Sequence, residues 1–144
     1  MKLTMIVSND DSKSVWNALI KSDFLSPNLS NTTLVLKENF YSNIPFKRSD
    51  RRHVIVSSNY KATDEFVIVF KSNDELLRRL EMLEEEIYMV GDIGMYNYFK
   101  DYIKNLYIIE VKNKEEIIID NKETIVDTEL YRISKIKKVE TNER

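Results

Sequence analysis

Short apolar runs alternate with amphipathic stretches from residue 3 to residue 111, and this alternation is the strongest constraint on the fold. Such runs are typical of buried strands, and strands that alternate with helices form a mainly parallel sheet with helices on both faces. After Val111 the pattern changes to shorter segments typical of antiparallel ribbons. The predicted strands are residues 3–7, 32–36, 53–58, 65–70, 87–90 and 106–111, followed by 115–120, 123–127 and 129–139. We therefore predict an α/β fold with an antiparallel C-terminal edge.

Three amphipathic helices are predicted between these strands. The first begins at Ser12, which can cap it, and ends at Pro27. The second opens with a capping box from Ser72 to Glu75, and the third begins at Gly94. Their apolar stripes are Val15, Trp16, Leu19 and Ile20 in the first helix, Leu76, Leu77, Leu80 and Leu83 in the second, and Met95, Tyr98, Phe99, Tyr102 and Ile103 in the third. These stripes are expected to face the core.

Length and composition favour a single domain without a metal site. The 144 residues, 42% of them apolar, are enough for one packed core, and we expect one domain over residues 1–144. A net charge of −2 gives no overall field to attract nucleic acid or an anionic membrane. The sequence has no cysteine, and His53 is its only histidine, so no metal-ligand pattern is present. It lacks a signal-peptide pattern and a run of about 20 apolar residues, which favours a cytoplasmic protein without a membrane partner.

Both glycines of the chain, Gly91 and Gly94, lie in the sequence IYMVGDIGMYNYF, between a predicted strand and a predicted helix. A glycine-marked turn from strand to helix allows backbone amides and the helix N-terminus to face a phosphate. In an open α/β sheet, such turns lie at the edge where ligands bind. The stretch therefore predicts a nucleotide site.

The same stretch, with the strand NLYIIEV that follows, resembles the dihydrofolate reductase family. In that family a strand ends in a Gly-Gly pair, the next helix carries a tyrosine, and the next strand begins with Leu-Tyr. Without gaps, RRHVIVSSN at residues 51–59 is similar to the family's Arg-Lys-Asn-aliphatic-Ser-Ser strand, and TLVLKENFYSNIP at residues 33–45 takes the place of the strand that carries Gly-Arg-x-Thr. One continuous register thus covers residues 33–111. It implies that the strands at 53–58 and 87–90 lie inside the sheet. The residues expected to be buried there are Val54, Val56, Ile87 and Met89.

The resemblance implies NADPH-dependent reduction of dihydrofolate to tetrahydrofolate. Arg51 aligns with the family arginine that binds the glutamate carboxylate of folate, a task suited to a guanidinium group. Trp16 aligns with a family tryptophan on the substrate side, and the serine pair at 57–58 aligns with hydroxyls near the adenine-ribose end of the cofactor. The cofactor-binding residues implied in this way are Gly91, Asp92, Tyr96, Ser57, Ser58 and Lys37.

The departures from the family pattern fall on the cofactor positions. Asp92 stands where the family has the second glycine of its pair, and a carboxylate there would repel a diphosphate. Lys37, Glu38, Asn39 and Phe40 replace the Gly-Arg-x-Thr segment, so the arginine that meets the 2′-phosphate of the cofactor is absent. Because loss of a charged contact to phosphate costs about 1.5–3 kcal/mol, we expect NADPH to bind weakly or not at all.

The reductase reaction needs a carboxylic acid in an apolar pocket, so that the pterin can be protonated before hydride arrives. Asp23, in the sequence KSDFL, is the predicted proton donor because an acid followed by aromatic and aliphatic residues is similar to the family helix. If the first helix starts at Ser12, Asp10 or Asp11 takes the position at its entrance instead. Two functions stay open, since a fold does not fix a function. One is a reductase with a folate-like ligand, and the other is an inactive module that binds an unknown protein partner.

Overall fold

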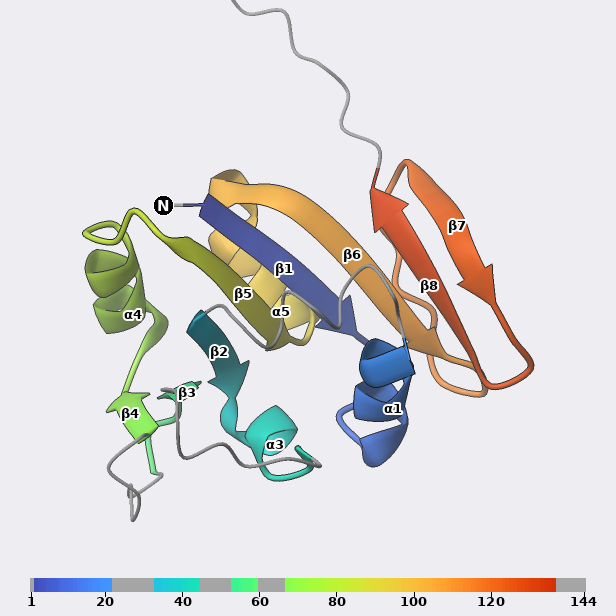
Figure 1. Cartoon of the computed structure of the whole chain (residues 1–144), viewed down its shortest axis with the longest axis horizontal. Helices are drawn as coiled ribbons and strands as arrows, with labels where there is room; N and C mark the ends of the chain where they lie inside the picture. The colour runs from blue at the N-terminus through green and yellow to red at the C-terminus, as the bar shows by residue number, and fades with distance from the viewer. Residues whose placement is uncertain (1, 22–32, 45–52, 60–66, 137–144) are drawn as a thin grey trace, which may run out of the picture.

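One eight-stranded sheet forms the centre of the computed structural model, which describes residues 2–21, 33–44, 53–59 and 67–136 (Figure 1). The strand order is β4-β3-β2-β5-β1-β6-β8-β7. The strands are β1 (Lys2–Ser8), β2 (Thr33–Lys37), β3 (His53–Val56), β4 (Val67–Phe70), β5 (Glu86–Gly91), β6 (Ile103–Val111), β7 (Lys122–Asp127) and β8 (Tyr131–Ile136). The helices are α1 (Lys13–Lys21), α3 (Glu38–Tyr41), α4 (Asn73–Leu80), α5 (Ile93–Phe99) and the short 3-10 helix η1 (Lys100–Tyr102).

The predicted parallel sheet with an antiparallel C-terminal edge is confirmed. The strands from β1 to β6 pair in parallel, whereas β8 pairs antiparallel with both β6 and β7. β3 and β5 lie inside the sheet, and Val54, Ile87 and Met89 are buried as expected. Val56 is only half-buried, because it is the last residue of β3 and lies at the edge where the parallel strands end.

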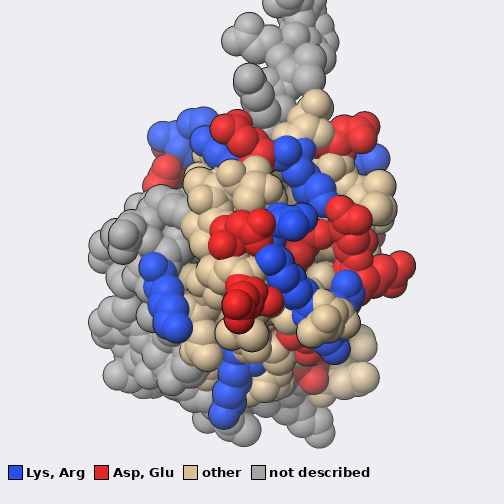
Figure 2. All heavy atoms as spheres, turned by 90° about the vertical axis from the view of Figure 1, so that its right-hand side faces the viewer, with Lys and Arg blue, Asp and Glu red and all other residues tan. Residues whose placement is uncertain are grey.

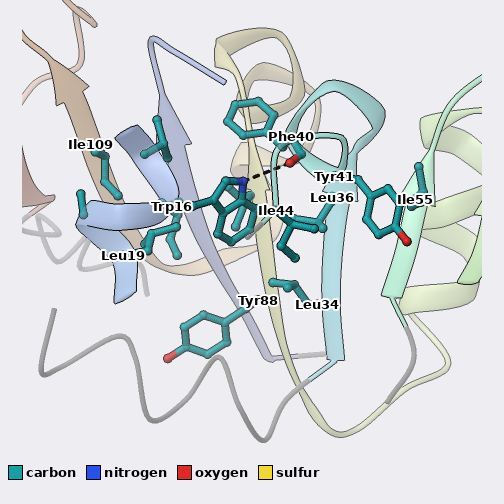
Figure 3. Packing of buried hydrophobic residues seen from close by; sticks show 14 of the residues in the cluster. Trp16, Leu19, Leu34, Leu36, Phe40, Tyr41, Ile44, Ile55, Tyr88 and Ile109 are labelled. Atoms are coloured by element: carbon teal, nitrogen blue, oxygen red, sulfur yellow. Dashed lines mark hydrogen bonds between the residues drawn. The ribbon is translucent and has the colours of Figure 1, made fainter. Parts of the chain in front are cut away.

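Helices cover both faces of the sheet. Neighbouring residues of a strand point to opposite faces, so each strand contributes side chains to the core on either side. In β1, Leu3, Met5 and Val7 belong to the core that α4 and α5 complete. Ile6 belongs to the core on the other face, which α1 and α3 complete. Trp16 lies in this second core, where its indole Nε1 donates a hydrogen bond to the carbonyl oxygen of Phe40 at 3.0 Å (Figure 3).

Two predicted helix starts are confirmed by their capping contacts. Ser12 precedes α1, and its Oγ accepts a hydrogen bond from the Ser14 amide at 3.2 Å. Ser72 caps α4 and accepts from the Glu75 amide at 3.2 Å. The Glu75 carboxylate accepts in return from the amide of Lys71, one residue before the cap. The predicted end of the first helix at Pro27 lies outside the described residues.

Other boundaries differ from the prediction. The third helix ends at Phe99, because Ile103 pairs with Leu3 of β1 and begins β6. Tyr98 and Tyr102, predicted to face the core, are exposed, whereas Met95 and Phe99 of the same stripe are buried. The segment after β2, for which no helix was predicted, contains α3. Residues 115–120, predicted as a strand, are irregular.

The face formed by β7 and β8 carries interleaved basic and acidic side chains (Figure 2). One ion pair on this side joins Lys112 Nζ to Asp127 Oδ1 at 2.6 Å, with both side chains well exposed. Such a mixed surface agrees with the nearly balanced charge of the sequence. Within the described residues, no helix is long and apolar enough to cross a membrane.

Candidate functional site

A pocket of about 530 Å³ opens at the carboxyl ends of the parallel strands. Ser8 ends β1, Asp92 follows β5, and Phe40 lies in the helix that follows β2. This edge is the usual place for a ligand in an open α/β sheet. We call this cavity the crevice pocket. It is lined by Ser8, Asn9, Asp10, Asp11, Asn39, Phe40, Asp92, Ile93, Glu115, Glu116, Ile117 and Ile118.

The crevice pocket is acidic. Five of its lining residues carry a carboxylate, and no Lys or Arg is among the described residues that line it. Two of the carboxylates, Asp10 and Asp11, follow β1 directly. Asp10 accepts a short hydrogen bond from the Ser12 hydroxyl, and Asp11 Oδ2 accepts from Asn39 Nδ2 at 2.8 Å. These contacts fix both carboxylates beside the cavity.

The outer wall of the crevice pocket is the segment between β6 and β7. Asn9 fastens it to the end of β1, because its side chain accepts from the Val111 amide at 2.8 Å and donates to the Glu115 carbonyl at 2.9 Å. Glu110, whose side chain is 8% exposed, accepts from the Ile117 amide at 3.1 Å and pairs with Lys122 at 3.4 Å. Lys122 also donates to the Ile117 carbonyl at 2.8 Å. The irregular wall is thus held by side chains instead of by strand pairing.

A second pocket of about 300 Å³ lies beside the first and contains two lysines, Lys37 and Lys71. We call it the lysine pocket. Ser57, Ser58 and Ser72 add hydroxyl groups to its lining, and Val56, Asn73, Gly94 and Met95 complete it. Ammonium and hydroxyl donors of this kind suit a phosphate.

The ion pair between Lys37 and Asp92 stands between the two pockets. The distance from Lys37 Nζ to Asp92 Oδ2 is 2.6 Å, and Asp92 Oδ1 also accepts from the Met95 amide at 3.1 Å, which caps α5. Partial burial opposes ionisation of Asp92. The hydrogen bonds from Lys37 and Met95, with the charge of Lys37, outweigh this effect and hold the pKa of Asp92 below its usual value.

The turn at Gly91 and Gly94 does not use the conformational freedom of glycine, since neither residue has a positive φ. Gly91 is instead required by close packing, because a Cβ there would lie 2.5 Å from the Sδ atom of Met95. From the sequence, the backbone amides at this turn were expected to face a phosphate. Instead, the Met95 amide donates a hydrogen bond to the capping carboxylate of Asp92. The turn lies at the predicted edge of the sheet, but its local chemistry differs from the prediction.

The other predicted site residues fall into four groups. Ser57, Ser58 and Lys37 line the lysine pocket. Tyr96 is half-buried and packs against the core that includes α4 and α5. Trp16 is fully buried, and its indole N–H is bonded to Phe40, so the structure does not support substrate binding by this residue. Asp23 and Arg51 lie outside the described residues.

Sequence reasoning did not find several of the lining residues. Lys71 and Asn73 flank the predicted cap at Ser72, but nothing in the sequence indicates that this helix start faces Lys37. The wall at 115–118 follows β6 and was predicted to be a strand. Asp10 and Asp11, the alternatives that the sequence offered if the first helix starts at Ser12, both line the crevice pocket. Within the described part of the chain, no three His, Asp or Glu side chains lie together in a way that could hold a metal ion.

The sheet order and the crevice at its carboxyl edge place the protein in the dihydrofolate-reductase-like class of α/β folds. One solved structure with this fold is dihydrofolate reductase from Enterococcus faecalis complexed with NADP(H) and RAB-propyl, with a TM-score of 0.56, 15% identity, and coverage of 93% of this chain and 95% of that chain. The sequence model of the family described as dihydrofolate reductase matches residues 21–144. The chain therefore belongs to the dihydrofolate reductase family. A comparison with curated protein sequences finds no match.

Proposed function

We propose that the protein reduces dihydrofolate to tetrahydrofolate with NADPH, and that it binds this cofactor weakly. The observation that carries the proposal is the pair of carboxylates, Asp10 and Asp11, beside the crevice pocket at the end of β1. The reaction consumes one proton and one hydride, and a carboxyl group beside the pterin supplies or relays the proton. NADPH supplies the hydride when it is bound.

The donor set of the lysine pocket supports binding of the cofactor's 2′-phosphate. Lys37 and Lys71 bring positive charge there, and Ser58 brings a hydroxyl group, whereas the Ser57 hydroxyl already donates to the Glu38 carboxylate. The chemistry beside it does not fit a diphosphate, because Asp92 is ionised and already paired with Lys37. We infer that the pterin ring occupies the crevice pocket, that Arg51 holds its glutamate tail, and that the whole chain acts as one cytoplasmic domain.

The experiment is a reductase assay that follows the oxidation of NADPH in the presence of dihydrofolate. We expect turnover at high NADPH concentration, and a loss of most of the rate in Asp11→Asn or Asp10→Asn at neutral pH. Asp23→Asn is the matched comparison, since Asp23 is the carboxyl that the resemblance favours. If only Asp23→Asn loses activity, the proton donor lies in the helix and not at the end of β1. If all three variants keep the wild-type rate, none of these carboxyls is the donor.

A second candidate function is binding without catalysis, and the Lys37–Asp92 pair favours it. An inactive module that binds only a protein partner would show no NADPH oxidation and no rise in melting temperature with NADPH, folate or methotrexate under conditions in which an active reductase responds. Any ligand that binds the native state alone must raise that temperature. A thermal shift with folate and methotrexate in an inactive protein would support a folate-binding module.

A further inference from the structure

Two strands that are neighbours in the sheet carry the Lys37–Asp92 pair. Lys37 is the last residue of β2, and Asp92 directly follows β5. β2 and β5 pair in parallel, with Leu36 opposite Val90, so the two side chains meet just beyond the end of the pairing. Lys37 lines the lysine pocket, and Asp92 lines the crevice pocket. A ligand that occupies both pockets therefore has to pass this ion pair.

The pair is fixed on the Asp92 side. The side chains of Lys37 and Asp92 are 46% and 32% exposed, so both remain accessible to a ligand. Asp92 is oriented by the Met95 amide as the N-cap of α5, which prevents it from turning away without loss of the cap. The positive charge of Lys37 is thus balanced by Asp92, whereas no ion pair joins Lys71 to another of the described residues.

The other charges near the boundary between the two pockets also oppose the binding of a phosphate. The crevice pocket contributes Asp10, Asp11, Glu115 and Glu116 in addition to Asp92. A diphosphate that crosses from the lysine pocket to the crevice pocket would approach these carboxylates, and it would have to compete with Asp92 for Lys37. Repulsion between like charges in a partly desolvated cleft weakens binding strongly.

We propose that Asp92 is a specificity-determining residue, which acts as a fixed counter-ion for Lys37 and selects against ligands that carry a diphosphate across the boundary between the two pockets. The crevice pocket then favours a heterocyclic ligand that is uncharged or cationic where it meets Asp92. This inference concerns the same site as the proposed reductase activity and rests on it only for the choice of NADPH as the probe.

The test compares the dissociation constants of NADPH and inorganic diphosphate for the wild type and Asp92→Asn, measured by calorimetry on the whole chain. Asparagine caps a helix as well as aspartate, so α5 should keep its start while the negative charge is removed. We expect NADPH to bind Asp92→Asn about tenfold or more tightly than the wild type, as expected for one recovered charged contact. Asp92→Ser, which also keeps a capping oxygen, provides a second variant with the same expected direction.

A second substitution tests whether the gain depends on Lys37. In the Asp92→Asn background, Lys37→Met should remove most of the gain, because the released ammonium group is the proposed contact of the phosphate. The matched control is Asp127→Asn. It breaks a Lys–Asp pair of the same 2.6 Å length, which lies outside both pockets. NADPH affinity should not change in this control.

Three results would overturn the inference: a submicromolar dissociation constant of NADPH for the wild type, an unchanged constant in both Asp92 variants, or a gain that survives Lys37→Met. Failure of the proposed reductase function can be distinguished from failure of this inference. If Asp92→Asn binds NADPH more tightly but does not reduce dihydrofolate, the specificity role of Asp92 stands and the reductase activity does not.

Discussion

At the scale of single residues, Gly91 is constrained by a neighbouring side chain. Gly91→Ala would place a Cβ 2.5 Å from Met95 Sδ and 3.2 Å from Met95 Cβ, and Met95 is buried in the core. We expect this variant to lose about 1–3 kcal/mol of unfolding free energy, the usual cost of overpacking. Gly94→Ala is the control, because its Cβ would lie 3.5 Å from Asp92 at an exposed helical position. It should gain up to about 1 kcal/mol from helix propensity. Urea unfolding of both variants measures the difference, and equal effects would contradict the packing argument.

The lowered pKa of Asp92 predicts a specific pH dependence of stability. A carboxyl whose pKa is lower in the folded state contributes stability above its unfolded value, and loses it as the pH falls through the folded value. Asp92→Asn should therefore be less stable than the wild type at neutral pH, and the gap should close as the pH falls below the ordinary aspartate value of 3.8. Urea unfolding of both proteins across this range tests the prediction. If the difference in unfolding free energy between the two proteins does not change with pH, the charge of Asp92 is not the source of that difference.

At the scale of elements, the wall between β6 and β7 depends on Lys122. Lys122→Met leaves the buried Glu110 carboxylate without its cation, and we expect a loss of about 2 kcal/mol or more of unfolding free energy. Adding Glu110→Gln should recover part of this loss, because the neutral amide can still accept from Ile117. Hydrogen exchange of the 112–121 amides should rise in the single variant.

Lys112→Met is the control for this element, because the Lys112–Asp127 pair is exposed and contributes little. Its unfolding midpoint and the exchange of the 112–121 amides should match the wild type. If Lys122→Met behaves in the same way as this control, the buried pair does not fix the wall.

Most elements could be predicted from the sequence, because buried strands and capped helices leave local patterns. The helix at Ser72 and the strand at residues 87–90 are examples. The end of α5 could not be predicted, because the helical spacing continues through Tyr102 and only pairing with β1 turns Ile103 into a strand residue. Residues 115–120 have the composition of a strand, but side chains far away in the sequence hold them in an irregular path.

The candidate site was only partly predictable for the same reason. Alignment with the family indicated Lys37, Ser57 and Ser58, and these residues do share a pocket. Sequence also indicated that Asp92 would oppose a phosphate, but not that Lys37 would be its partner, since the two residues are 55 positions apart. For Trp16, helical spacing predicted a place in the core and alignment suggested a ligand contact, and the indole is fully buried in the core.

At the scale of the whole molecule, the continuous sheet predicts one cooperative unfolding transition, as expected for a single domain. Trp16 is the only tryptophan and is fully buried on the α1 and α3 side, so its fluorescence reports that core alone. Circular dichroism reports helices and strands on both faces. The two probes should give the same midpoint in urea. Separate midpoints would show that the two faces unfold independently.

The position of β1 sets the order in which a growing chain can complete its structure. β1 precedes the other described strands in the chain, yet its neighbours in the sheet are β5 and β6, which are synthesised much later. The hydrogen bonds of the Asn9 side chain form even later, because its partner Val111 lies 102 residues further along the chain. Until then, this strand, in which only Lys2 is exposed in the folded protein, has two unpaired edges, and unpaired strand edges promote aggregation. The crevice pocket can close only when residue 118 has emerged, so ligands cannot assist folding before most of the chain exists.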